Sequence, residues 1–378
     1  MSQTRTYLDY NATAPLRPEA REAMVRALDT FGNPSSVHAE GRRARAIVEE
    51  AREAVAVLVN AKPSEVVFTS GATEANAWAI SGALSGQWAA ILVSAAEHDS
   101  VRGPASHYAA LKGIRVNELA VSVDGIADLG QLDAPKDGSL LLALQLANNE
   151  TGVIQDVARA AALGAEHRFS LHTDAVQAAG RMVVDFRSLG ATTLSLSAHK
   201  LGGPKGVGAL VIRDGYELPA LIPGGGQERR RRAGTENVAA IAGFGSAAKA
   251  ALAELDQMSR VAAMRDGLEA EVVRLTPEAV CIGSDAPRLP NTSCIALPGQ
   301  AAETLVIKLD LAGIAVSAGA ACSSGKVGQS HVLTAMGLAP DIARSAIRVS
   351  IGTATTEQDL AAFVAAWNAI GNAGRLAA

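Results

Sequence analysis

The sequence predicts an α/β protein with a mostly parallel, mixed central sheet flanked by helices and with a smaller α+β domain. Apolar runs alternate with helical stretches between about residues 65 and 240, and several are continuously apolar, as strands buried on both faces must be. The 36 glycines are typical of tight turns between strands and helices. The 378 residues, 48% of them hydrophobic, are enough for two domains with sizeable cores.

The first half of the chain contains two predicted helices and five predicted strands. The helices are expected over 18–28 and 39–59, on either side of the loop FGNPSSVH. The strands that follow are VVFTS (66–70), AILVSA (90–95), LLLALQL (140–146), FSLHTD (169–174) and TTLSLS (192–197). Because each is followed by a helix or crossover, we expect them to pair mainly in parallel.

The pattern changes after about residue 240. A largely helical stretch over 239–274 precedes short strands and helices, which are expected at 292–297, 303–309, 314–317, 330–336, 347–351 and 356–370. The change of pattern indicates a second domain. The predicted division is a large domain over 16–255 and a small domain made of 1–15 and 256–378.

The charges give little sign of a polyanionic partner. There are 34 basic and 38 acidic residues, a net charge of −4, and no N-terminal signal or run of 18 apolar residues is present. We expect a cytoplasmic protein that binds neither nucleic acid nor membrane. The four arginines at 229–232 leave one alternative open, a non-enzymatic nucleic-acid-binding protein.

Polar residues gather where the predicted strands end. In an open parallel sheet these ends lie at one edge, where ligands bind. Lys200 comes at the tip of the fifth strand, just after Ser197 and His199. Alone, such a lysine is most often a solvated surface charge, and Lys205 is a second candidate. The other strand ends contribute the turn 71–73, His98, Asn149, Asp174 and Gln177.

This set suits pyridoxal 5′-phosphate (PLP). The cofactor needs a lysine, an anionic partner for its ring nitrogen, a phosphate cradle and a group that orients the ring. Asp174 suits the ring nitrogen and His98 suits the ring face. The turn 70–73 precedes a helix and so suits the phosphate, with Ser197 and His199 as further donors. A metal site through His172 and Asp174 is a weaker alternative, because no clustered ligand spacing accompanies it.

The three cysteines differ in context. They are odd in number and contain no CxxC pair, so they predict neither a disulfide framework nor a zinc site. Cys281 and Cys294 lie in apolar, strand-like runs and are expected to be buried and inert. Cys322 lies among Ala, Gly and Ser in SAGAACSSG, which predicts an exposed, mobile and reactive thiol.

The chain resembles a known family, the NifS/IscS-type cysteine desulfurases. They belong to the class V aminotransferase group of fold-type I PLP enzymes. The resemblance covers nearly the whole chain and rests, in order, on YLDYNATAP, FGNPSSVH, VVFTSGATEAN, AAEHDSV, ANNETGVIQD, HTDAVQAAG, SLSAHKLGGPKGVGAL, GGGQERRRRAGTENV, SAGAACSSG and SAIRVSIG. Arg230 stands where these proteins often have glycine, which puts the local turn in doubt.

The resemblance implies a role for each candidate residue. Lys200 would bind PLP covalently, Asp174 would face its ring nitrogen, and His98 would stack on the ring. Asn149 and Gln177 would lie near the substrate and the ring hydroxyl. The phosphate ligands would be Ala72, Thr73, Ser197, His199 and, from the neighbouring subunit of a homodimer, Thr235. Arg348 would hold the substrate carboxylate, and Cys322 would receive the sulfur.

The implied reaction converts L-cysteine to L-alanine and leaves a persulfide on Cys322. Lys200 would act as base at the α-carbon, and His98 would move protons on the substrate or on the Cys322 thiol. The sulfur would pass to a scaffold or carrier protein in iron–sulfur cluster assembly or other thiolation. A selenocysteine lyase or an aminotransferase of the same class is the nearest alternative, and it would not need Cys322.

Overall fold

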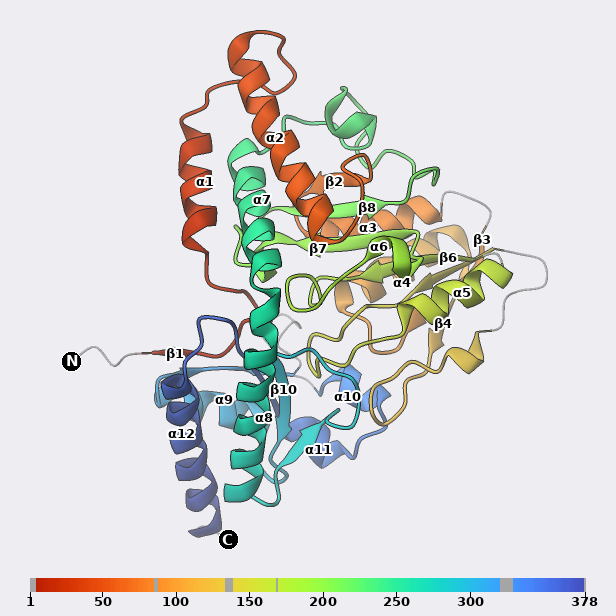
Figure 1. The fold of residues 1–378 in the computed structure, drawn as a ribbon. Helices are drawn as coiled ribbons and strands as arrows, with labels where there is room; N and C mark the ends of the chain where they lie inside the picture. The colour runs from red at the N-terminus through yellow and green to blue at the C-terminus, as the bar shows by residue number, and fades with distance from the viewer. Residues whose placement is uncertain (1–4, 85–87, 133–138, 168, 320–328, 377–378) are drawn as a thin grey trace.

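The fold is built on a seven-stranded sheet with helices on both faces (Figure 1). The computed structural model describes residues 5–84, 88–132, 139–167, 169–319 and 329–376. A second, smaller sheet lies beside the long helices α8 (Met258–Leu275) and α12 (Glu357–Leu376). This is the predicted combination of an α/β sheet with a smaller α+β part.

The large sheet is mixed. Its strands follow the spatial order β2 (Val66–Thr69), β8 (Gly208–Ile212), β7 (Thr193–Ser197), β6 (Phe169–Asp174), β5 (Ser139–Ala143), β3 (Trp88–Ser94) and β4 (Arg115–Leu119). Neighbours from β7 to β4 pair in parallel, whereas β8 is antiparallel to both β2 and β7. All five predicted strands are present, and β4 and β8 are additional.

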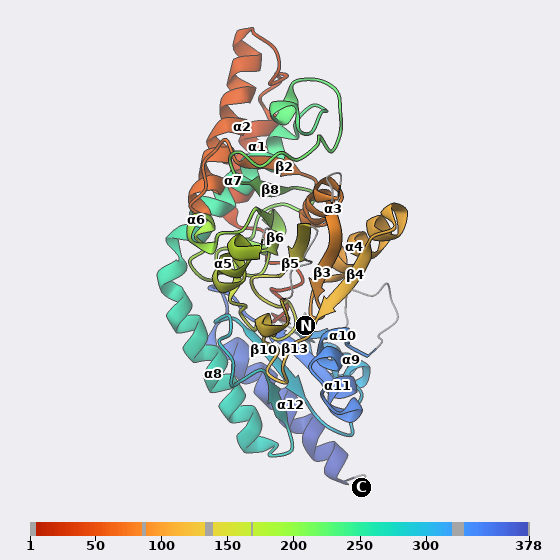
Figure 2. The same ribbon diagram turned by 90° about the vertical axis from the view of Figure 1, so that its right-hand side faces the viewer.

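Helices cover both faces of this sheet (Figures 1 and 2). One face carries α2 (Ala39–Leu58), with α7 (Val238–Ala253) and α1 (Pro18–Leu28) packed beside it, as well as α5 (Val157–His167) and the short α6 (Phe186–Leu189). The other face carries α3 (Ala72–Ala83) and α4 (Asp99–Lys112). Helices α2 and α7 approach closely at Gly245, where a Cβ atom would lie 2.5 Å from the Ala51 Cα.

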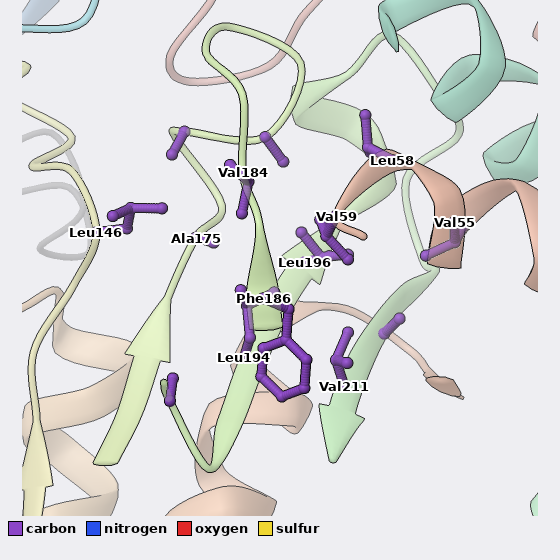
Figure 3. Close-up of a cluster of buried hydrophobic side chains, with 14 of the residues drawn as sticks. Val55, Leu58, Val59, Leu146, Ala175, Val184, Phe186, Leu194, Leu196 and Val211 are labelled. Atoms are coloured by element: carbon purple, nitrogen blue, oxygen red, sulfur yellow. The ribbon is translucent and has the colours of Figure 1, made fainter. Parts of the chain in front are cut away.

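The main core lies between the sheet and α2 (Figure 3). Val55 and Leu58 of α2 belong to the same buried cluster as Leu194 and Leu196 of β7, with Phe186 beside Leu194, and all five are at most 4% exposed. Burying each of these large side chains stabilises the fold by about 1.5–3 kcal/mol.

The smaller sheet is antiparallel. Its order is β12 (Ser317–Ala318), β13 (Ala346–Ser350), β10 (Thr292–Ala296) and β9 (Val280–Ile282). Its apolar face packs on α8, α12 and α9 (Ala302–Leu311), with Phe363 and Trp367 of α12 fully buried. The first strand, β1 (Thr6–Tyr7), pairs in parallel with β11 (Ile314–Ala315), so the single strand predicted over 314–317 is two short ones. Helices α10 (His331–Ala335) and α11 (Pro340–Ser345) complete this part.

The helical stretch predicted over 239–274 is broken. Within the described residues there are four short 3₁₀ turns, η1 (Leu129–Gln131), η2 (Ala198–Lys200), η3 (Gln227–Arg230) and η4 (Leu255–Gln257). The last of them, η4, separates α7 from α8. The Glu254 carboxylate at this break accepts hydrogen bonds from Arg17 and Thr353, which fixes the bend. In the described ranges no single helix is long and apolar enough to cross a membrane. One pair of helices, 238–253 and 255–275, would be long and apolar enough if taken together, but the two are bent by 50° relative to each other. The domain boundaries at 15 and 255 stay a prediction.

Candidate active site

A cavity of about 550 Å³ opens at the edge where the parallel strands end. Ten of the twelve predicted site residues line it: Ala72, Thr73, His98, Asn149, Asp174, Gln177, Ser197, His199, Lys200 and Arg348. Thr235 lines a neighbouring cavity, which shares Ser70 and Gly206 with the first. Cys322 lies outside the described residues.

Lys200 lies at the end of η2, directly after β7. It is half-buried, and its Nζ donates hydrogen bonds to the backbone carbonyls of Asn11 and Ala12, the latter at 2.9 Å. Lys205 lines the same cavity but is exposed. The geometry therefore favours Lys200 as the lysine that meets a ligand, because its amine is already desolvated and oriented.

Asp174 ends β6 and is held by two N–H donors. Its Oδ1 accepts from the Val176 backbone at 2.9 Å, and its Oδ2 accepts from Asn76 Nδ2 at 2.7 Å. The carboxylate is only 9% exposed. This arrangement suits a partner that brings a proton on a ring nitrogen.

The N-terminus of α3 offers a cradle for an anion. Ala72 and Thr73 form its first turn, where backbone N–H groups have no partner within the helix. A Cβ atom on Gly71 or on Gly206 would meet nothing within 4 Å, so both glycines face open space. Burial and the nearby lysines Lys200 and Lys205 lower the pKa of His199 to about 4, so its ring is neutral near pH 7.

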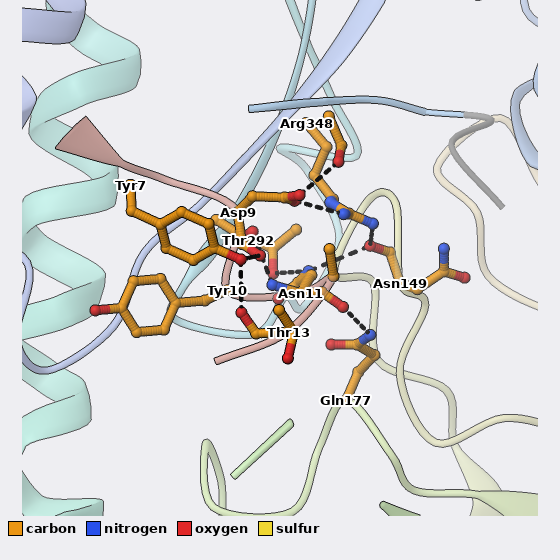
Figure 4. A network of polar contacts seen from close by, with 12 residues as sticks. Tyr7, Asp9, Tyr10, Asn11, Thr13, Asn149, Gln177, Thr292 and Arg348 are labelled. Atoms are coloured by element: carbon orange, nitrogen blue, oxygen red, sulfur yellow. Dashed lines mark hydrogen bonds and ion pairs between the residues drawn. The ribbon is translucent and has the colours of Figure 1, made fainter. Parts of the chain in front are cut away.

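Arg348, on β13, connects the cavity to the N-terminal segment (Figure 4). Its Nη2 donates to Asp9 Oδ1 at 2.7 Å and its Nη1 donates to the Asn149 carbonyl at 3.1 Å. The side chain is buried, and Nε has no hydrogen-bond partner among the described residues. Because Arg348 also lines the cavity, its guanidinium suits the carboxylate of a ligand.

Sequence reasoning missed several residues of this network. Asn11 donates to the Asn149 carbonyl, and its own carbonyl accepts from Gln177 Nε2 at 3.1 Å as well as from Lys200 (Figure 4). Arg181 donates to Gln177 Oε1. Burial, together with the charge of Arg348, lowers the Arg181 pKa to about 9. Asn11 lies within the motif YLDYNATAP, but these three partners lie more than 100 positions away, and sequence spacing does not indicate them.

The cavity fits PLP on its donor set. It combines a desolvated lysine, a carboxylate with two fixed N–H donors, an open helix N-terminus and an imidazole at one wall. These groups supply the covalent anchor, the ring-nitrogen partner, the phosphate ligands and the ring contact.

The comparisons with known proteins agree with this geometry. Residues 6–363 match the aminotransferase class-V family. The chain belongs to this family. It is 42% identical over 360 residues to a protein named cysteine desulfurase IscS from Dictyoglomus turgidum, covering 94% of this chain and 91% of that protein. It is 43% identical to a cysteine desulfurase from Cereibacter sphaeroides, with 94% and 93% covered.

Solved structures of similar proteins show the same fold. A NifS-like protein from Rickettsia africae superimposes with a TM-score of 0.88 at 32% identity, over 98% of this chain and all of that one. A structure described as SspA in complex with cysteine has a TM-score of 0.80 at 30% identity, with 92% and 99% covered. The predicted family, the fold-type I architecture and the dependence on PLP are thereby confirmed.

The residues that suggested a metal site or a nucleic-acid-binding surface make contacts within the fold. His172 uses both ring nitrogens in hydrogen bonds, to Asn76 and Thr193, and no group of three possible metal ligands occurs in the described residues. Of the arginines at 229–232, Arg229 donates to the Pro63 carbonyl and Arg232 pairs with Glu74 at 2.6 Å. This part of the arginine run therefore serves contacts within the chain.

The two described cysteines belong to the smaller sheet and do not line the cavity. Cys294 in β10 is buried as predicted, and Cys281 in β9 is half-buried. Burial raises the pKa of the Cys281 thiol to about 11 and that of Cys294 still further. Both are thiols, not thiolates, near pH 7, which fits the expected inert role.

Proposed function

We propose that this chain is a cysteine desulfurase, which converts L-cysteine and the thiol of Cys322 to L-alanine and a Cys322 persulfide. The main support is Arg348. Its guanidinium belongs to the wall of a cavity that also holds Lys200, as an α-amino acid substrate requires. The desulfurase names of relatives at 42% and 43% identity also support it.

The residues take the following roles in this reaction. PLP, when bound, draws electrons away from the substrate α-carbon. Lys200 takes the α-proton, Arg348 holds the carboxylate, and Asp174 keeps a proton on the ring nitrogen. Asn149 and Gln177 orient the substrate and ring, with His98 against the ring.

Cys322 completes the reaction. Its thiolate attacks the substrate sulfur, and the new S–S bond forms as the Cβ–S bond breaks. The electron pair left on Cβ takes up one proton to give the methyl group, and the α-carbon regains a proton from Lys200 to give alanine. His98 moves protons near the substrate and Cys322. These roles rest on the sequence for Cys322 and on the placement of the other side chains in the cavity.

We also propose a homodimer with shared sites. Thr235 is exposed and lines a cavity beside the α3 N-terminus, which suits a phosphate ligand offered to a partner subunit. The surface near α1 exposes Leu28, Phe31 and Val37, at 71%, 83% and 88%. Apolar exposure of this extent is typical of an interface.

The sulfur acceptor and the location are further parts of the proposal. Several relatives are named IscS, and we propose a scaffold or sulfur-carrier protein of iron–sulfur assembly as the acceptor, in the cytoplasm.

The test is an assay of alanine released from L-cysteine. Wild-type protein loaded with PLP should release alanine and pass sulfur to an added thiol, whereas Cys322→Ser should lose sulfur transfer by at least about a hundredfold. Cys281→Ser is the matched control and should behave as wild type. Unchanged desulfuration in Cys322→Ser would favour a selenocysteine lyase or aminotransferase, and protein that stays colourless with PLP would overturn the enzyme assignment.

A further inference from the structure

A buried chain of hydrogen bonds connects Asp174 to His98. Asn76 on α3 contributes its amide to the middle of the chain, with Ser100 and His98 on one side and His172 and Thr193 on the other. Asn76, His172 and Thr193 are at most 2% exposed, and Ser100 is 8% exposed. Donor and acceptor chemistry fixes the direction of every bond in this chain.

The direction starts at Asp174. A carboxylate accepts hydrogen bonds, so the Asn76 atom 2.7 Å from Asp174 Oδ2 must be the NH₂ group. The Asn76 oxygen therefore faces His172 Nε2, 2.9 Å away, and because it can only accept, His172 Nε2 carries the proton. Burial lowers the pKa of His172 to about 4, so the ring is neutral and Nδ1 accepts from Thr193 Oγ1 at 2.9 Å.

The other branch reaches His98. The second hydrogen of the Asn76 amide is directed at Ser100 Oγ, 2.9 Å away. The same oxygen lies 2.9 Å from His98 Nδ1, and the direction of this bond depends on whether Nδ1 carries a proton. The Ser100 backbone N–H donates to the same Nδ1 at 3.0 Å. A backbone N–H can only donate, so Nδ1 carries a lone pair and no proton, and the Ser100 hydroxyl must donate to it as well.

We propose that Asn76, Ser100 and His172 are positioning residues that hold His98 as the tautomer protonated on Nε2. His98 lines the cavity, and a proton added at Nδ1 would break the bond from the Ser100 backbone N–H and turn the Ser100 hydroxyl from donor to acceptor. Resting on the proposed desulfurase reaction, this sets the protonation of His98 before the substrate binds, with the proton that it can give on Nε2. The same amide fixes the Asp174 carboxylate, so one buried chain orients two groups of the site.

Neutron diffraction of the PLP-loaded protein tests the chain without measuring activity. We expect deuterium on Nε2 of both His98 and His172, on Thr193 Oγ1 toward His172, and on Ser100 Oγ toward His98. Deuterium on His98 Nδ1, or an Asn76 oxygen facing Asp174, would overturn the proposal. Either result leaves the desulfurase assignment untouched, because alanine release is measured separately.

A pair of variants tests the contribution of the Ser100 hydroxyl. In protein labelled with ¹⁵N-histidine, the His98 ring signals are assigned by their loss in His98→Gln and report the tautomer ratio. Ser100→Ala removes one donor and should shift the ratio toward the Nδ1-protonated form by about fivefold. Ser100→Thr keeps the hydroxyl and should match the wild type. An unchanged ratio in Ser100→Ala would show that the hydroxyl does not set the tautomer.

Discussion

Removing one partner of the buried ion pair between Arg52 and Glu228 is expected to be among the most destabilising single changes. Arg52 on α2 donates from Nη1 and Nη2 to the two oxygens of Glu228, at 2.7 and 2.8 Å. Arg52 also donates to the Val66 carbonyl, and Glu228 accepts from the Phe68 backbone. The residues are 3% and 5% exposed, so neither charge is solvated by water.

The variant Arg52→Met keeps most of the aliphatic stem and leaves the Glu228 carboxylate buried with one backbone donor. Breaking a buried pair in this way costs about 3–5 kcal/mol of the free energy of unfolding. The matched control is Arg43→Met on the same helix. Its pair with Glu40 spans 3.0 Å but its side chain is 67% exposed, so we expect a change below about 0.5 kcal/mol.

Equilibrium unfolding in urea, at one fixed protein concentration and with PLP present, measures both changes. The Thr235 segment follows Glu228 in sequence, so Arg52→Met should also weaken retention of PLP during dialysis. A loss of less than about 1 kcal/mol in Arg52→Met, or an equal loss in Arg43→Met, would refute the reasoning.

Three further outcomes are expected. Arg230 has φ 65°, a left-handed conformation that is strained for arginine, so Arg230→Gly should raise the free energy of unfolding by about 1 kcal/mol in urea titrations. A lower free energy of unfolding in the variant would show that this strain does not matter. Burial raises the Glu150 pKa to about 7, above its ordinary value of 4.5. A raised carboxyl pKa stabilises the fold fully below pH 4.5, and this contribution fades as the pH rises through 7. The free energy of unfolding of wild type should therefore fall between about pH 5 and 8 by about 3 kcal/mol more than that of Glu150→Gln. Parallel plots of this free energy against pH for the two proteins would exclude the raised pKa. Arg348→Met should lower kcat/KM for L-cysteine by about 10- to 150-fold, mainly by raising KM. The matched control is Arg344→Met, which changes an exposed arginine and should behave as wild type. An unchanged KM in Arg348→Met would show that Arg348 does not bind the substrate carboxylate.

The sequence predicted most of the fold because its strands are buried on both faces. Strands β5, β6 and β7 are continuous or alternating apolar runs, and helix α1 lies within its predicted bounds. Strand β4 was not predicted, because it is an edge strand, RVNEL, with four exposed side chains and no apolar pattern. Strand β8 is a short apolar run, GALVI, whose antiparallel pairing with β2 and β7 no local signal indicates.

The candidate site was predicted from strand ends and family motifs, but its supporting contacts were not. Asn76 and Asp174 lie 98 positions apart, and Arg52 and Glu228 lie 176 apart, so only the folded chain brings them together. The turn at Arg230, where glycine is often found in the family, forms in this chain with left-handed backbone angles. Glu228, Arg229 and Arg230 all have positive φ, of 45°, 57° and 65°, and the turn forms without glycine because the buried Glu228 side chain anchors it.

The most direct test of the proposed function is the fate of the substrate sulfur. PLP-loaded protein is mixed with L-cysteine in the absence of any acceptor, quenched by thiol alkylation, digested and analysed by mass spectrometry. We expect one extra sulfur atom on the peptide that contains Cys322, matched by one alanine released per subunit. Extra sulfur on Cys281 or Cys294 instead, or alanine release with no sulfur on Cys322, would contradict it.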